Sequence, residues 1–165
     1  MPPRMLVILS GRPGVGKTTI ATALARATGA VHVRIDSIEQ VLRDAGVNVR
    51  GEGYSVAHAV AADNLRLGFL VIADCVNPWP LTRQEWRAVA DQAGAIALEV
   101  EIVCSDADEH RRRVESRHTD ISGHPLPAWQ DVIARDYRPW DRDRLVIDTA
   151  RLTVDESVRA IQASL

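Results

Sequence analysis

The segment that most constrains the fold of this chain spans residues 11–18 and reads GRPGVGKT. Its spacing is G-x-x-x-x-G-K-T, in which glycines let backbone amides curl around phosphate oxygens. Lys17 is the only lysine, since the other 19 of the 20 Lys and Arg residues are arginine. Keeping lysine only here indicates that a slim ammonium group must reach phosphates where a planar guanidinium would not fit. The segment predicts a nucleotide phosphate site between a strand and a helix.

Each part of the predicted loop has an expected role in binding phosphate. The following helix directs its positive N-terminal end at the phosphates, and Lys17 is expected to reach the β- and γ-phosphates. The Thr18 hydroxyl is placed to hold Mg²⁺. The alternative is an accidental glycine turn before a helix. We expect nucleotide contacts from Gly11, Pro13, Gly14, Val15, Gly16, Lys17, Thr18 and Thr19.

Apolar runs alternate with helical patterns along the whole chain, which is typical of βαβ units and a parallel sheet. Strands are predicted over residues 5–9, 31–35, 69–73, 97–104 and 145–147. Helices are predicted over residues 17–28, 37–45, 56–67, 82–93, 105–118 and 128–137, and after Thr153. The pattern predicts a three-layer α/β fold with helices on both faces of a five-stranded sheet.

We find no linker or repeat, so residues 1–165 are expected to form one domain. The polar segment 119–127 contains Pro and Gly and is read as a loop, with a lid at about 119–126. Capping boxes are expected at Thr82 with Glu85 and at Thr153 with Glu156, and Ser105 is expected to cap the helix that follows it.

The composition limits the kinds of partner and the location that we expect for this chain. A net charge of −2 gives no basic field that would attract nucleic acid. No apolar run approaches the roughly 20 residues that span a bilayer, and the N-terminus lacks a signal-peptide layout, so we expect a cytoplasmic protein. Cys75 and Cys104 suggest buried thiols rather than a disulfide. We expect a monomer or a weak dimer.

Two aspartates follow predicted strands, where ligands of parallel α/β sheets bind. Asp36 comes directly after the second strand and could act as a general base on an acceptor hydroxyl, or only cap the next helix. Asp74 ends the third strand in the pattern LVIAD, which is typical of a carboxylate that holds Mg²⁺ but also of many strand ends.

The helix before the predicted lid is rich in arginine. Asp108 with Arg112, and Glu109 with Arg113, are spaced as i,i+4 ion pairs, so these arginines could simply be solvated. Arg117 has no acid four residues before it and lies beside the lid. It is therefore the better candidate to stabilise a transferring phosphoryl group.

The acceptor is expected between the second and third helices and the loop after the third strand. For each candidate the alternative is ordinary solvation or packing, and two converging arginines would favour an anionic acceptor. The candidates are Arg43, Arg50, Tyr54, Arg66, Asn77 and Trp79. His110, His118 and His124 lack metal-site spacing and are read as surface or lid residues. Residues 129–140 could close over the acceptor or only pack against the hinge of the lid, and the sequence assigns them neither role.

With these motifs the chain resembles the small P-loop kinases of the nucleoside-monophosphate-kinase-like class. These include bacterial kinase-like ATPases related to chloramphenicol phosphotransferase and zeta-toxin kinases. The resemblance implies the sheet order 2-3-1-4-5 and ATP with Mg²⁺ as donor. It also implies that Arg113 lies by the adenine, that Arg117 touches phosphates, and that Asp36 is the catalytic base.

The expected function is transfer of the γ-phosphate of ATP to a hydroxyl of a small molecule, with Asp36 as base and Lys17 and Arg117 stabilising the phosphoryl group. Asp36, Arg43, Arg50, Tyr54, Asn77 and Trp79 would contact the acceptor, and Thr18 and Asp74 would hold the metal. The alternatives are a regulatory ATPase with no small-molecule acceptor and a kinase of nucleotides or nucleic-acid ends.

Overall fold

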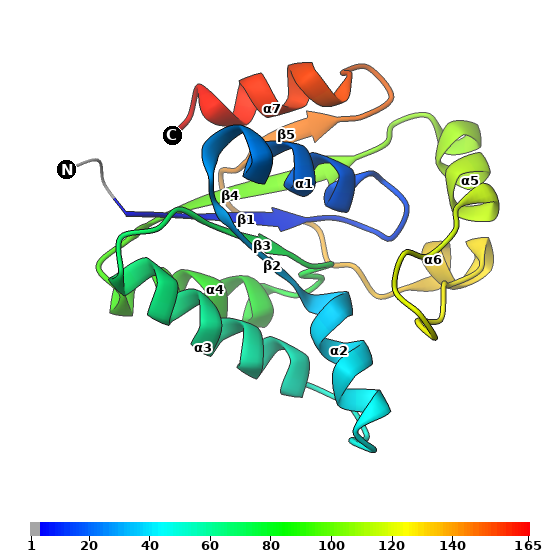
Figure 1. The fold of residues 1–165 in the computed structure, drawn as a ribbon. Coiled ribbons are helices and arrows are strands. Elements are labelled where there is room, and N and C mark those ends of the chain that lie inside the picture. The colour runs from blue at the N-terminus through cyan, green and yellow to red at the C-terminus, as the bar shows by residue number, and fades with distance from the viewer. Residues whose placement is uncertain (1–3) are drawn as a thin grey trace.

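The computed structural model describes residues 4–165 and contains a five-stranded sheet (Figure 1). All four strand pairs are parallel, and the order is β2-β3-β1-β4-β5. The strands are β1 (Met5–Ser10), β2 (Val31–Arg34), β3 (Val71–Asp74), β4 (Ile96–Val103) and β5 (Leu145–Asp148). The predicted fold class and strand order are confirmed.

Helices cover both faces of the sheet, and α2, α5 and α6 lie beyond the carboxyl ends of the strands (Figure 1). They are α1 (Lys17–Thr28), α2 (Ile35–Asp44), α3 (Glu52–Arg66), α4 (Pro80–Gln92), α5 (Ala107–Ser116), α6 (Trp129–Ala134) and α7 (Val154–Gln162). One face carries α1 and α7, and the other carries α3 and α4 (Figure 1). Helices α1, α2, α4, α5 and α7 each follow a strand, so the strand-to-helix loops collect at the carboxyl ends of the strands.

The alternation of side chains along β1 divides the core into two layers. Leu6 and Ile8 pack into the layer formed with α3 and α4, and Val7 and Leu9 pack into the layer formed with α1 and α7. All four are fully buried because β1 is the central strand. Successive side chains of a strand point to opposite faces, so one apolar run serves both layers. This rigid centre carries the loop at residues 11–16.

Two predicted helix caps are wrong, and each has a local cause. Pro80 occupies the first helical position of α4, where its missing N–H costs nothing, so the helix begins before Thr82. The Thr82 hydroxyl then donates to the Trp79 carbonyl at 3.0 Å. Asp106, not Ser105, caps α5, because its side chain accepts the amides of Asp108 and Glu109.

Other boundaries differ from the predictions: α3 begins at Glu52 rather than at residue 56, β3 spans Val71–Asp74 rather than 69–73, and α6 ends at Ala134 rather than at residue 137. The capping box of Thr153 with Glu156 is confirmed at the start of α7. Residues 1–3, which carry part of the expectation about a signal segment, lie outside the described residues. None of the helices in residues 4–165 combines the length and apolar character that a membrane crossing requires.

Candidate active site

The loop between β1 and α1 is shaped by glycines that allow close packing. Gly14 has a φ of 82°, and a Cβ there would overlap the side chain of Val114 in α5. A Cβ on Gly11 would collide with the carbonyl oxygen of Ile102 in β4. Gly16 has a φ of 110° and turns the chain into α1. The backbone therefore curls over the carboxyl end of β1, as the motif predicts.

Lys17 lies inside this loop and is almost fully buried. Its Nζ donates to the carbonyl oxygens of Gly11 at 2.7 Å and Arg12 at 3.0 Å. Burial lowers the pKa of Lys17, while the nearby charges of Asp74 and Asp36 oppose that shift. An anionic ligand at the loop would compensate the same buried charge, so the site favours phosphate.

Thr18 and Asp74 are in contact at the carboxyl end of β3. The Thr18 hydroxyl donates to Asp74 Oδ2 at 2.8 Å, and His32 Nε2 lies 3.0 Å from the same oxygen. Burial raises the pKa of Asp74, but the His32 hydrogen bond, the Lys17 charge and the Thr18 hydrogen bond outweigh it, so the pKa lies below its usual value. Asp74 is therefore ionised at neutral pH.

The pair fits a magnesium ion by its chemistry, because hydroxyl and carboxylate oxygens are the ligands that Mg²⁺ takes. Within residues 4–165 no group of three or more His, Cys, Asp and Glu side chains is arranged to hold a metal. Mg²⁺ does not require one, since it keeps several waters and binds through one or two protein oxygens and the substrate phosphates.

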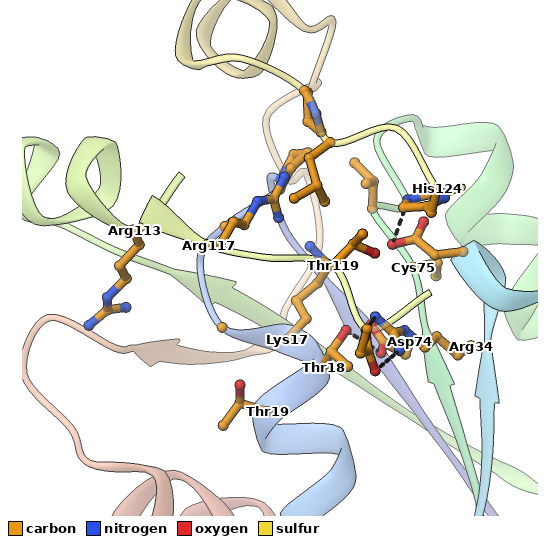
Figure 2. Close-up of a pocket in the computed structure, with 18 of the residues that line it drawn as sticks. Lys17, Thr18, Thr19, Arg34, Asp74, Cys75, Arg113, Arg117, Thr119 and His124 are labelled. Atoms are coloured by element: carbon orange, nitrogen blue, oxygen red, sulfur yellow. Dashed lines mark hydrogen bonds and ion pairs between the residues drawn. The ribbon is translucent and has the colours of Figure 1, made fainter. Parts of the chain in front are cut away.

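Two arginines come from the end of α5 and have different partners (Figure 2). Arg113 donates to Glu109 Oε1 at 2.7 Å and to the hydroxyl and carbonyl oxygens of Thr149 at 2.8 and 3.0 Å. Arg117 has a buried Nε with no hydrogen-bond partner in the described part of the chain. Burial lowers its pKa. The Glu109–Arg113 pair is confirmed, whereas Arg112 pairs with Glu109 rather than with Asp108.

Residues 117–128, between α5 and α6, contact the end of β2 and the start of α2. Arg34 holds Asp120 with two hydrogen bonds of 2.8 and 2.9 Å. His124 Nε2 lies 3.6 Å from Asp36 Oδ2, and its side chain is only 10% exposed. In Figure 2 a dashed line marks this contact, and Thr119 and Arg117 lie above Lys17. This segment thus borders one side of the phosphate site.

A cavity of about 990 Å³ surrounds the loop, which we call the phosphate cavity. Its seven basic side chains are Lys17, Arg26, Arg34, Arg43, Arg113, Arg117 and Arg135. Its carboxylates are Asp36, Glu39, Asp74, Asp120 and Asp131. The excess of basic groups matches a ligand with several negative charges.

A second cavity of about 920 Å³ opens between α2, α3 and the start of α4, which we call the acceptor cavity. It shares with the phosphate cavity the residues Asp36, Glu39, Val76 and Arg135. Asp36 lies in the first turn of α2 and its side chain is 51% exposed. It therefore faces both cavities at the point where they meet.

Glu39, one turn after Asp36, is a junction residue that sequence reasoning missed. Burial raises its pKa, while Arg43, which donates to it at 3.1 Å, opposes the shift. Gly53 makes room for Glu39, because a Cβ on Gly53 would overlap its side chain. The i,i+3 spacing from Asp36 was the available signal, since it places both carboxylates on one helix face.

Residues 135–140, which had no predicted role, are fixed by two arginines. Buried Arg83 donates to the carbonyl oxygens of Asn77, Pro78, Arg138 and Pro139, and its guanidinium lies 4.1 Å from the Trp140 ring. Arg12 donates to the carbonyl oxygens of Val132 and Arg135. The segment therefore joins the phosphate loop to the loop after β3 and brings Arg135 to both cavities.

Comparison with known proteins identifies the family. Residues 6–139 match the model of a family described as an AAA domain. The chain belongs to this AAA domain family. A search of curated proteins found no match.

Three solved structures share the fold of this AAA domain along nearly its whole length. A candidate kinase from Chloroflexus aurantiacus j-10-fl is 21% identical, with a TM-score of 0.75 and 99% of each chain covered. APS kinase CysC of Mycobacterium tuberculosis, in complex with AMPPNP and APS, is 18% identical, with a TM-score of 0.68 and coverage of 99% and 98%. A gluconokinase from Sinorhizobium meliloti 1021 is 20% identical, with a TM-score of 0.63 and coverage of 97% and 90%. The fold is that of the P-loop NTPases.

The AAA domain places most predicted site residues at its two cavities. Loop residues 13, 14 and 16–19, together with Asp74, Arg113 and Arg117, line the phosphate cavity. Arg50, Tyr54 and Trp79 line the acceptor cavity, and Asp36 lines both. Gly11 and Val15 are buried within the loop and line neither cavity.

Four predictions need correction. Arg43 lines the phosphate cavity and not the acceptor cavity. Asn77 is fully buried and lines neither cavity, because its side chain donates to the Ser10 hydroxyl. Arg66 pairs with Asp63 on an exposed turn of α3. His110 is not a surface residue, since its ring is buried with Nε2 2.8 Å from the Pro13 carbonyl oxygen.

Proposed function

We propose that this protein is an ATP-dependent phosphotransferase that moves the γ-phosphate of ATP to a hydroxyl of a small molecule. The observation that carries the proposal is the position of Asp36 where the phosphate cavity meets the acceptor cavity. A protein that only binds or hydrolyses a nucleotide needs no second cavity of about 920 Å³ beside the phosphate site. The kinases with the same fold support the proposal.

In this function, the phosphate cavity stabilises the charge of the transferring group. Lys17 contacts the β- and γ-phosphates, and Arg117 contacts the phosphoryl group, because its guanidinium has an unpartnered Nε among the described residues. Arg113 lies beside the loop at Thr149, which would border the adenine. Thr18 and Asp74 would hold Mg²⁺, which supplies positive charge to the phosphate oxygens.

Asp36 performs the proton transfer. Its carboxylate accepts the proton of the acceptor hydroxyl while that oxygen bonds to the γ-phosphorus, and the bond from the γ-phosphorus to the bridging oxygen breaks to release ADP. Arg50, Tyr54 and Trp79 are the proposed acceptor contacts. The lid excludes water, which would otherwise compete as an acceptor.

The test is Asp36→Asn, which keeps the side-chain volume and removes the proton acceptor. We expect ATP affinity to be retained and transfer to fall by about 10²- to 10⁴-fold, the range for general-base catalysis. A metabolite library screened for ADP release, with mass spectrometry of the products, first supplies an acceptor. Asp63→Asn, on an exposed turn of α3, is the matched control.

Two results would contradict the proposal. Transfer by Asp36→Asn at a rate near that of the wild type would remove the base assignment. ADP release without any phosphorylated product across the library would instead indicate a regulatory ATPase.

A further inference from the structure

The charges of the acceptor cavity have the opposite balance to those of the phosphate cavity. Its carboxylates are Asp36, Glu39, Glu52, Glu85 and Asp136, and its arginines are Arg50 and Arg135. The two residues Arg43 and Arg50 do not converge here, because Arg43 faces the phosphate cavity. The predicted convergence of Arg43 and Arg50 is therefore absent, and the two arginines that do line this cavity are outnumbered by its five carboxylates.

The carboxylates that belong to this cavity alone differ in how far they are neutralised. Asp136 accepts a hydrogen bond from Trp79 Nε1 at 3.0 Å and pairs with Arg138. Glu52 accepts the backbone amide of Arg50, which leaves its charge in place. Glu85 is exposed on α4 and has no ion pair or hydrogen bond among the described residues. Glu85 is thus the carboxylate most available to a positively charged ligand.

The nearby histidine adds little positive charge at neutral pH. Burial lowers the pKa of His58, and the charge of Glu85 only partly opposes the shift. The ring lies edge-on to Trp86, with centroids 4.4 Å apart, and its Nε2 is buried without a hydrogen-bond partner in residues 4–165. His58 therefore leaves the acidic balance of the cavity nearly unchanged.

Apolar side chains form the open side of the same cavity. Val56, Trp79 and Leu81 line it and remain 40%, 45% and 62% exposed. Large side chains exposed together at the mouth of a cavity typically contact an apolar part of a ligand. The Trp79 ring can also attract a cation through its π face.

We propose that the acceptor is a hydroxyl compound that carries an ammonium group and an apolar portion. Its hydroxyl reaches Asp36, its ammonium group lies toward Glu85, and its apolar portion rests on Trp79. The inference rests on the proposed function, because it names the acceptor class of that site. An anionic acceptor would instead meet carboxylates here and would be drawn to the seven basic residues of the phosphate cavity.

A binding experiment tests the acceptor class without requiring transfer. The probes are 2-amino-1-phenylethanol, 1-phenylethane-1,2-diol and mandelate, which share a benzylic hydroxyl and differ in charge. Each is titrated by calorimetry into the full chain with AMPPNP and Mg²⁺. We expect the ammonium probe to bind about tenfold or more tightly than mandelate, with the diol between them. Equal affinities, a reversed order, or no saturable binding of the ammonium probe would overturn the inference.

Substitutions that change the charge of residue 85 test whether Glu85 causes the preference for the ammonium probe. Glu85→Lys is expected to remove or reverse the preference for the ammonium probe, and Glu85→Gln to weaken it. Both substitutions lie on an exposed helix position, and AMPPNP binding should not change. A wild-type order of affinities in Glu85→Lys would contradict the proposed placement.

The outcome is separable from that of the proposed function. Selective binding of the ammonium probe with no phosphorylated product from the metabolite library would sustain the acceptor class and remove the transferase. Efficient transfer to a carboxylate or phosphate compound would sustain the transferase and contradict the proposed acceptor class.

Discussion

The phosphate cavity and the acceptor cavity share four residues but are built in different ways. The phosphate cavity is organised by eight consecutive residues whose backbone forms the loop. The acceptor cavity is assembled from the side chains of α2, α3, α4 and the segment around Arg135. Phosphate has the same shape in every nucleotide, so a loop of backbone atoms can bind it. An acceptor has no such constant shape, so it is recognised by side chains.

The charges of the two cavities separate the two ligands. Basic side chains dominate the first cavity and carboxylates dominate the second. The residues Asp36 and Glu39 stand between them on one face of α2. In the proposed function, a molecule with strong negative charge is directed to one side of Asp36, and the reacting hydroxyl to the other. Substitutions in one cavity should therefore leave ligand binding in the other cavity unchanged.

Among substitutions confined to one of the two cavities, the largest effect is expected from Lys17→Met, which disables the phosphate cavity alone. Loss of the ammonium group should reduce ATP turnover by about 10²- to 10³-fold, as for removal of one group that stabilises transition-state charge. Binding of 2-amino-1-phenylethanol without nucleotide should be unchanged. Steady-state kinetics and calorimetry measure the two, with Arg159→Met on the exposed side of α7 as control. Wild-type turnover in Lys17→Met would contradict the role of the lysine.

Smaller effects are expected from substitution of Arg117 and Arg113 in the phosphate cavity, and the two substitutions should change different kinetic constants. Arg117→Ala should reduce kcat by about a hundredfold with little change in the KM for ATP, because its free guanidinium can act on the transferring group. Arg113→Ala should mainly raise the KM for ATP, since Arg113 is held by Glu109 and Thr149. Equal effects on kcat would show that the two arginines do not differ in this way.

A further prediction concerns Trp79 in the acceptor cavity. Trp79→Ala should weaken binding of 2-amino-1-phenylethanol about tenfold, because an exposed aromatic anchor and a cation–π partner are lost. AMPPNP affinity should not change. Trp79→Phe separates the ring from the Nε1 hydrogen bond to Asp136. If Trp79→Phe binds as weakly as Trp79→Ala, the hydrogen bond and not the aromatic face carries the contact.

The fold could be predicted from the sequence because its signals are local. The run MLVIL gives β1, the spacing of residues 11–18 gives the loop, and alternating strands and helices leave few other topologies. Errors occurred where neighbouring residues compete for one role. Pro80 moved the start of α4 ahead of Thr82, and Asp106 capped α5 one residue after Ser105. Such choices depend on backbone geometry that spacing does not record.

The acceptor cavity could be predicted only in part, because it depends on contacts between distant segments. Arg83 was given no role, yet its hydrogen bonds bring residues 138 and 139 to the loop after β3 across 55 and 56 residues of sequence. Asn77 was a candidate by its position, but its hydrogen bond to Ser10 turns it into the interior. Sequence places a residue near a site and does not show which way its side chain points.

The smallest expected effect concerns two histidines: half-buried His58, which lines the acceptor cavity, and buried His110, which contacts the phosphate loop at Pro13. Burial lowers the pKa of His58 and also of His110, where the Pro13 hydrogen bond only partly opposes the shift. The folded state therefore binds fewer protons than the unfolded state just below pH 6.5, so the stability that these groups contribute is full above that pH and is lost as the pH falls. Urea unfolding across pH 7.5 to 5.5 should show this decline, and His58→Asn should reduce it.

The same two histidines report which cavity a ligand occupies. A bound ammonium group near Glu85 should lower the pKa of His58 further, because a positive charge disfavours the imidazolium, and should leave that of His110 unchanged. AMPPNP with Mg²⁺ should move the resonances of His110, which contacts the phosphate loop at Pro13, and not those of His58. Proton NMR titration of the two rings, assigned with His58→Asn, measures both. If each ligand moved both histidines equally, the two cavities would act as one site, and the separation by charge on either side of Asp36 would be wrong.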